Sequence, residues 1–160
     1  MAGATSLVMY EAEQKEIQAV IERLTHDSRA KACFVIDKNG QALASAGQVA
    51  GLDITSLASL TAGSISATGG LARVLGESGD FAATYNEGTK DNLYMTIVNG
   101  RIILVVTFNN DTSSLGLVRL RVKKAGDELG VVINRIVAKS GTGEAPLGEI
   151  TDDDIDNLFS

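Results

Sequence analysis

The side chains that usually perform catalysis are few in this sequence and lie far apart. The 160 residues contain one histidine, His26, and one cysteine, Cys33. One imidazole and one thiol cannot hold a structural zinc ion, which takes about four ligands at close spacing. The sequence has no Gly-x-Ser-x-Gly motif for a nucleophilic serine and no Walker motif for nucleotide phosphates. We therefore predict a protein that is not an enzyme and that uses neither a metal ion nor a cofactor.

The potentially reactive residues have structural interpretations. His26 lies near the C-terminal end of a predicted helix, where the helix dipole stabilises a cationic group, so we expect it on the surface. Cys33 begins the apolar run Cys33-Phe34-Val35-Ile36, which predicts a buried thiol. The pair Gly69-Gly70 does not follow a predicted strand, so it does not predict a phosphate-binding loop.

The charged residues are distributed unevenly along the chain. Residues 1–140 contain equal numbers of basic and acidic side chains. The net charge of −6 therefore arises in residues 141–160, whose charged residues are all acidic: Glu144, Glu149, Asp152, Asp153, Asp154 and Asp156. An acidic tail on a neutral body repels phosphates, which excludes nucleic acid as a partner. The sequence also lacks a run of about 18 apolar residues and a signal-peptide pattern, so we expect no membrane insertion and a cytoplasmic location.

The hydrophobic pattern predicts one α/β (α+β) domain, residues 1–139, in which helices cover an antiparallel sheet. Helical spacing predicts helices over about 11–27, over 54–76 with Asp53 or Thr55 as N-cap, and from Ser113 or Ser114 onward. Strands are expected over 31–37, 41–46, 81–86, 93–98 and 101–108, and a type I′ turn at Asn39-Gly40 is expected to join the first two. The order α-β-β-α-β-β-β-α with hairpin connections predicts five antiparallel strands.

The second predicted helix has no charged residue between Asp53 and Arg73. At about 100° per residue it divides into two faces. The face expected to pack on the sheet contains Leu57, Leu60, Ser64, Ala67, Leu71, Val74 and Leu75. The opposite face, which we name the small-residue stripe, contains Ser59, Ala62, Ser66, Gly70 and Arg73, and is flanked by Ala58, Ile65 and Gly69.

The small-residue stripe is interpreted as a surface on which another protein lies. Glycine in a helix costs roughly 1 kcal/mol relative to alanine, and this helix contains Gly63, Gly69 and Gly70. Such a sequence usually makes use of the close approach that small residues allow. Two alternatives remain open, namely tight packing within one chain and a break in the helix near Gly69-Gly70.

The C-terminal residues predict a second docking element. Residues 140–149 form a Gly-rich segment that we interpret as a flexible linker. Residues 150–160 form an acidic amphipathic tail with Thr151 as N-cap and one apolar face: Ile155, Leu158 and Phe159. A helix of about nine residues is too short to be stable alone in water, so its apolar face is expected to dock in a partner's groove. Docking on its own domain is the alternative.

Six segments carry a resemblance to a known family: LVMYEAE, DKNGQALASAGQ, DITSLASLTAGSISATGGLARVLGE, DNLYMTIVNGRIILVV, TSSLGLVRLRVKKAGDEL and the terminal EITDDDIDNLF. With the order of elements, they resemble the Roadblock family of dynein light-chain relatives. Within that family the chain is most similar to the bacterial MglB group, whose members are partners of the Ras-like GTPase MglA.

The resemblance implies a homodimer whose sheets join edge to edge and whose second helices lie side by side. One GTP-bound MglA-like GTPase would sit across the paired helices, giving two copies of this chain per GTPase, and its GTP hydrolysis would be accelerated. The GTPase would supply its own Arg and Gln rather than receive an arginine finger such as Arg73. Carried over by position, the contact surface falls on Ala58, Ala62, Ser66 and Gly70. Ser66 stands where alanine is expected in relatives, and both side chains are small.

A second contact with the GTPase would map to the tail residues Ile155, Leu158 and Phe159. The function implied is activation of GTP hydrolysis in a cell polarity or gliding motility switch. The main alternative is a Roadblock scaffold that tethers a GTPase without changing its hydrolysis. A small-molecule sensor is a weaker alternative, because the sequence lacks a set of convergent polar residues.

Overall fold

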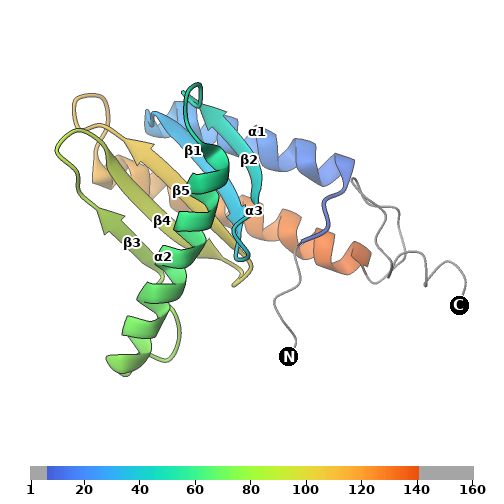
Figure 1. Ribbon diagram of the computed structural model, residues 1–160. Coiled ribbons are helices and arrows are strands. Elements are labelled where there is room, and N and C mark those ends of the chain that lie inside the picture. The colour runs from blue at the N-terminus through green and yellow to red at the C-terminus, as the bar shows by residue number, and fades with distance from the viewer. Residues whose placement is uncertain (1–6, 141–160) are drawn as a thin grey trace, which may run out of the picture.

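The computed structural model describes residues 7–140, which form three helices and five strands (Figure 1). In chain order these are α1 (Glu11–Ser28), β1 (Ala32–Asp37), β2 (Ala42–Gly47), α2 (Ile54–Val74), β3 (Ala83–Asn86), β4 (Asn92–Val98), β5 (Ile102–Phe108) and α3 (Leu115–Ser140). This is the order of elements that the sequence predicts. The helix α3 includes Ser140, the first residue of the predicted linker. The rest of that linker and the predicted tail lie outside the described residues.

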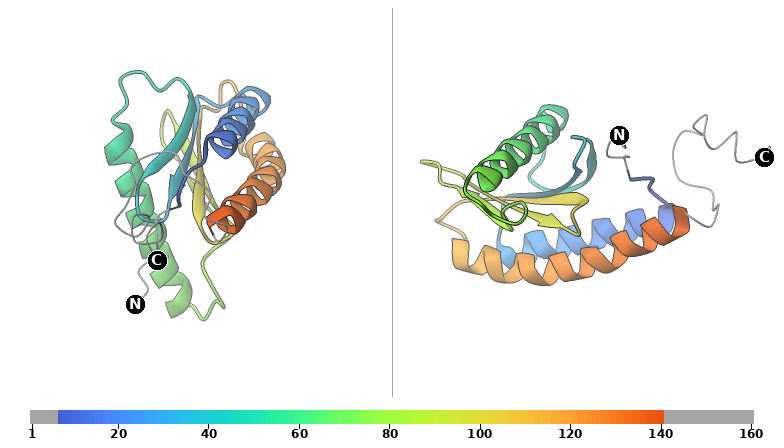
Figure 2. Two further views of the ribbon diagram at one scale, coloured as in Figure 1. Left: turned by 90° about the vertical axis from the view of Figure 1, so that its right-hand side faces the viewer. Right: turned by 90° about the horizontal axis from the view of Figure 1, so that it is seen from below.

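The five strands form one antiparallel sheet in the order β2-β1-β5-β4-β3. Figure 2 shows α1 and α3 side by side on one face of the sheet and α2 alone on the other face. The central strands β1 and β5 are covered on both faces and are almost entirely buried, which explains their continuous apolar sequences. The edge strands β2 and β3 are mostly exposed or half-buried.

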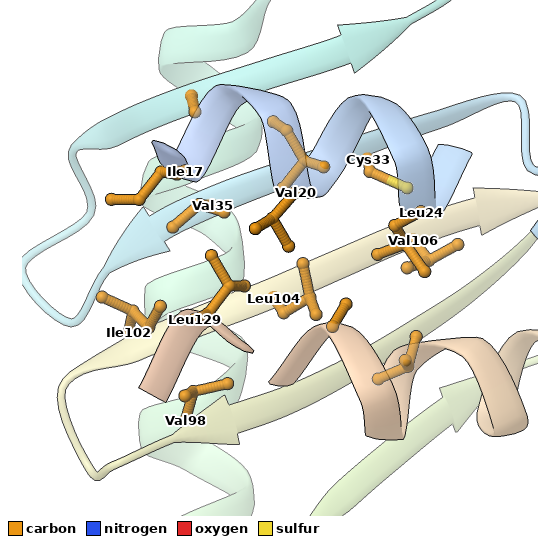
Figure 3. Close-up of a cluster of buried hydrophobic side chains, with 14 of the residues drawn as sticks. Ile17, Val20, Leu24, Cys33, Val35, Val98, Ile102, Leu104, Val106 and Leu129 are labelled. Carbon is orange, nitrogen blue, oxygen red and sulfur yellow. The ribbon is translucent and has the colours of Figure 1, made fainter. Parts of the chain in front are cut away.

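The larger core lies between the sheet and the helices α1 and α3 (Figure 3). Ile17 and Leu24 of α1 and Leu129 of α3 pack there against the strand residues Leu104 and Val106. A smaller core lies under α2 and contains Phe34, Ile36, Met95, Ile103 and Val105 together with Ala58 and Ile65 of α2.

Cys33 belongs to the larger core, where its side chain is inaccessible to solvent. Burial raises the pKa of its thiol to about 12, because the thiolate would lose its hydration. The prediction of a buried structural thiol is confirmed.

The two Asn-Gly turns have different geometries. Asn99 and Gly100 both have positive φ angles, 52° and 66°, as a type I′ turn requires. In the first hairpin only Gly40 has a positive φ, 91°, so the type I′ turn predicted at Asn39-Gly40 is wrong. The carboxylate of Asp37 instead accepts hydrogen bonds from the backbone N–H groups of Asn39 and Gln41, at 2.9 and 3.0 Å. This side chain organises a longer turn, and the strand register shifts beside it.

The two edges of the sheet are treated differently. On the outer edge of β2, the amide Nε2 atoms of Gln14 and Gln18 of α1 donate hydrogen bonds to the carbonyls of Leu43 and Ser45, both at 2.9 Å. Within residues 7–140, no side-chain hydrogen bond reaches the backbone of β3. The β2 edge is therefore protected, and the β3 edge is open.

A buried ion pair joins the beginning of α1 to the end of α3. Glu13 is 1% exposed, and its Oε1 lies 2.7 Å from Nζ of Lys139. Arg135 lies 3.8 Å from the same carboxylate, and Nζ of Lys139 lies 5.5 Å from the centre of the Tyr10 ring. The carboxylate thus faces two cations where little water reaches it.

Candidate interaction surface

The helix α2 is continuous from Ile54 to Val74, so the alternative of a break near Gly69-Gly70 is excluded. Asp53 is its N-cap, and its side chain accepts a hydrogen bond from the backbone N–H of Ser56 at 3.1 Å. This hydrogen bond and the one from the Ser56 hydroxyl lower the pKa of the Asp53 carboxyl. The N-cap is one of the two that the sequence predicts.

The orientation of α2 differs from the prediction. Its buried residues are Ala58, Thr61, Ile65, Gly69 and Ala72. Of the residues predicted to face the sheet, four are largely exposed: Leu60 (73%), Leu71 (59%), Val74 (83%) and Leu75 (73%). The prediction of the sheet-facing side was therefore wrong for these four residues, and mostly small side chains, together with Ile65 and the half-buried Leu57, contact the rest of the domain.

The close approach of two backbone segments explains this orientation. The first hairpin turn lies on α2, since a Cβ atom on Gly40 would be 3.6 Å from Cβ of Ala62 and 3.7 Å from the carbonyl oxygen of Ala58. Further along, a Cβ atom on Gly69 would be 2.5 Å from Oδ1 of Asp80. A larger side chain at Gly40 would press on the backbone of α2, whereas one at Gly69 would displace the carboxylate of Asp80. Packing within one chain, which the sequence left open as an alternative, thus explains part of the small-residue stripe.

The predicted site residues on α2 fall into three groups. Ala58 and Gly69 are buried against their own domain, so their assignment to a free interaction surface was wrong. Ala62 and Gly70 are half-buried. The exposed members of the stripe are Ser59, Ser66 and Arg73, which recur every seven residues and so share one side of the helix. The predicted tail residues Ile155, Leu158 and Phe159 lie outside the described residues.

The exposed leucines and valine form what we name the α2 ridge: Leu60, Leu71, Val74 and Leu75. Gly63 and Ala67, between them in the sequence, are small and exposed. No charged residue lies in α2 before Arg73, so the ridge lacks the charges that a solvent-facing helix usually carries. An exposed apolar surface of this kind is typical of a protein contact.

The ridge is followed in the chain by the open edge of the sheet. Figure 1 shows the C-terminal turns of α2 extending past the sheet, after which the chain returns to form β3. On β3, Tyr85 is partly exposed and stacks on Phe108, with ring centres 6.2 Å apart. Two surfaces suited to another protein, an apolar helix and the open outer edge of a strand, thus belong to consecutive elements.

The described part of the chain offers little for other functions. Residues 7–140 contain no group of three His, Cys, Asp or Glu side chains placed to bind a metal ion. His26 is exposed at the end of α1, as predicted, with its Nδ1 3.2 Å from Oδ1 of Asp27. None of the described helices has the length and hydrophobicity needed to cross a bilayer.

Known proteins with similar sequence and structure identify the family of this domain. Residues 16–108 match the model of the Roadblock/LC7 domain. Myxococcus xanthus MglB is 56% identical in sequence and has a TM-score of 0.76, with the match covering 81% of this chain and 96% of that protein. The chain belongs to the MglB group of the Roadblock/LC7 family.

Two further MglB structures are similar to this MglB-family chain. The gliding protein MglB of Thermus thermophilus is 30% identical with a TM-score of 0.75, and the match covers 81% of this chain and 97% of that one. A structure described as MglB with tetrameric arrangement is 29% identical with a TM-score of 0.77, covering 82% and 97% of the two chains. A search among curated proteins returns no match.

Sequence reasoning singled out α2 but missed the exposed residues of the α2 ridge. The leucines were assigned to the core because hydrophobicity alone ranks them as buried. The signal that could have located them is the absence of charge around the whole helix. A helix that faces solvent normally carries charged residues on its outer side. Because α2 carries none before Arg73, its outer side is suited to contact another protein.

Proposed function

We propose that this MglB-family chain activates GTP hydrolysis by a bacterial Ras-like GTPase of the MglA type, in a cytoplasmic cell polarity or gliding motility switch. It would act as a homodimer and a regulator rather than an enzyme, with two copies per GTPase. The observation that carries the proposal is the charge-free α2 ridge in a chain 56% identical to Myxococcus xanthus MglB.

The dimer would form through β3 and α2. Unpaired backbone groups on the β3 edge can bond to the same strand of a second copy. Such pairing would bring the two α2 helices together and remove part of each ridge from water. A two-fold axis makes this contact self-complementary, because each subunit offers the same surface to the other.

The GTPase would lie across the paired helices. Ser59 and Ser66, beside the ridge, are exposed and small enough for another backbone to approach closely. The dimer would hold the GTPase in a geometry that favours hydrolysis, and the reacting groups would come from the GTPase. The tail residues Ile155, Leu158 and Phe159 are proposed as the second contact with it.

The test combines the purified chain with the MglA-like GTPase of the same organism and measures phosphate release. We expect a rate above that of the GTPase alone. Ser66→Arg should abolish the stimulation but leave the dimer intact, because the arginine would block the approach without touching the core. Val74→Glu should weaken the dimer, the stimulation, or both.

Val131→Glu is the matched control, because Val131 is a 62% exposed valine on α3, on the opposite face of the sheet. It should behave as wild type in both phosphate release and sedimentation. Equal hydrolysis rates with and without the chain would contradict the proposal. If the chain binds the GTPase but leaves its rate unchanged, the alternative of a non-activating scaffold is correct.

A further inference from the structure

A groove of about 600 Å³ lies between α3 and β4, on the face of the sheet opposite α2. Its floor includes Val98 of β4 and Val122 of α3, which are buried. Leu120 of α3 also lines it and is exposed, with 62% of its surface open to water. We name this feature the α3 groove. Neither the helix pairing nor the proposed GTPase surface on α2 uses it.

The α3 groove has a basic rim. Arg119 and Lys123 line it, one helical turn apart, and Asp127 is the only acidic side chain in the lining. Arg121 and Lys124 lie on the same two turns of α3 but line a separate recess beside α1, together with Asp27 and Glu128. Within residues 7–140, neither Arg119 nor Lys123 forms an ion pair with a carboxylate. The groove therefore fits a ligand that combines acidic and apolar groups.

The chain contains such a ligand in its own sequence. Residues 150–160 carry four aspartates and no basic residue, together with the apolar residues Ile150, Ile155, Leu158 and Phe159. Residues 1–140 have no net charge, so the excess negative charge of residues 141–160 is available to the two cations of the groove, Arg119 and Lys123.

The length of the chain permits the contact. Ser140 ends α3, and the 17 residues back to Lys123 span about 25 Å at the helical rise. Residues 141–149 reach about 30 Å when fully extended. Residues 150–160 can therefore return along α3 to the groove of their own chain.

We propose that residues 150–160 dock in the α3 groove of their own chain, with aspartates near Arg119 and Lys123 and apolar side chains against Leu120. The proposed GTPase contact uses the same apolar residues, so docking in the groove and docking on a GTPase exclude each other. The free protein would keep the tail folded back, and GTPase binding would require its release.

Paramagnetic relaxation measured by NMR tests the docking without any GTPase, so its outcome is independent of the proposed function. A nitroxide is attached to the full-length chain at Ser160→Cys. The native Cys33 is buried and its pKa is raised to about 12, so it does not react. The labelled, ¹⁵N-enriched chain is diluted into excess unlabelled wild type, which isolates effects within one chain.

We expect the amide signals of Leu120 and Gly126 to lose at least half of their intensity, whereas those of α2 stay unchanged. The double variant Arg119→Glu, Lys123→Glu should restore the lost intensity, and 1 M salt should restore part of it because it screens the charges. Lys15→Glu is the matched control, because it reverses an exposed charge on α1 outside the groove lining, and the intensity loss should persist.

Three results would overturn the proposal. Unchanged intensities at the groove would show that the tail does not dock there. Losses spread equally over α2 and α3 would show a tail without a preferred position. Losses that occur only when the nitroxide is on a different chain from the ¹⁵N label would show that a second copy supplies the tail.

Discussion

A Cβ atom on Gly40 would lie 3.2 Å from Cα of Ser59, so the first hairpin turn packs directly on the backbone of α2. This contact fixes which side of α2 faces the domain, because no side chain of ordinary size separates the two segments. With that side occupied by small residues, Leu71 and Val74 are left on the exposed side. The packing of a glycine turn thus determines which residues are available to another protein.

Gly40→Ala should lower the free energy of unfolding by about 2 kcal/mol, because it adds a tight contact with Ser59 to the strain of a positive φ. Gly51→Ala is the control, since Gly51 also has a positive φ, 81°, but has no atom within 4 Å of an added Cβ. It should lower the free energy by only about 1 kcal/mol. Urea denaturation of both variants measures the difference. Equal losses would contradict a tight contact between the turn and α2.

The free energy of unfolding should fall as the pH rises above about 8.5. The Cys33 thiol has a pKa of about 12 in the folded chain, whereas an unfolded cysteine has about 8.5. The folded state therefore keeps its proton where the unfolded state loses it, and stability present below pH 8.5 is lost towards pH 12. Linkage gives a loss of about 2 kcal/mol at pH 10. In Cys33→Ala this part of the pH dependence should disappear, and an unchanged slope would argue against a buried thiol.

Glu13→Gln should lower the free energy of unfolding by about 1–3 kcal/mol, because it removes the charge that Lys139 and Arg135 face in a site with little water. Glu11→Gln is the matched control on the same helix. Glu11 is exposed and lies 3.4 Å from the exposed Lys15, so its loss should change stability by less than about 0.5 kcal/mol. Thermal denaturation at neutral pH compares the two variants. If they prove equally stable, the buried pair makes no special contribution.

Arg73→Ala should reduce the stimulated rate of GTP hydrolysis by less than tenfold. The guanidinium of Arg73 lies back along α2 near Gly69 and Gly70 rather than projecting away from the helix. An arginine that reached the transferred phosphate would instead be worth about 10³-fold or more. Single-turnover phosphate release with Arg73→Ala and Arg73→Lys decides between the two. A thousandfold loss in both variants would assign Arg73 to the reaction itself.

The elements of the fold could be predicted from the sequence because local signals specify them. The strand predicted over 93–98 and the helix predicted from Ser113 or Ser114 onward each depend on neighbouring residues, and both were predicted correctly. The cap at Asp53 likewise needs only Ser56, three residues away.

The orientation of α2 could not be predicted in the same way, because it depends on contacts between distant residues. Hydrophobicity places Leu60 and Leu71 inside, but the first hairpin turn packs through Gly40 on the backbone at Ser59, far away in the sequence, and this contact sets which side of α2 faces the domain. The predicted geometry of the first hairpin turn was wrong for a different reason. The hydrogen bonds that the Asp37 carboxylate accepts set that geometry, rather than the Asn-Gly pair.

The hydrogen bonds from Gln14 and Gln18 to β2 have a consequence for assembly. A sheet with two unprotected edges could add subunits at both ends and grow into a filament. Here two glutamine amides occupy carbonyls at one end, so in the proposed dimer strand pairing between copies would run through β3 alone and would stop at two chains. Larger oligomers would have to use the surfaces of the helices. Two side chains on α1 would thus limit polymerisation from a position far from the proposed partner surface on α2.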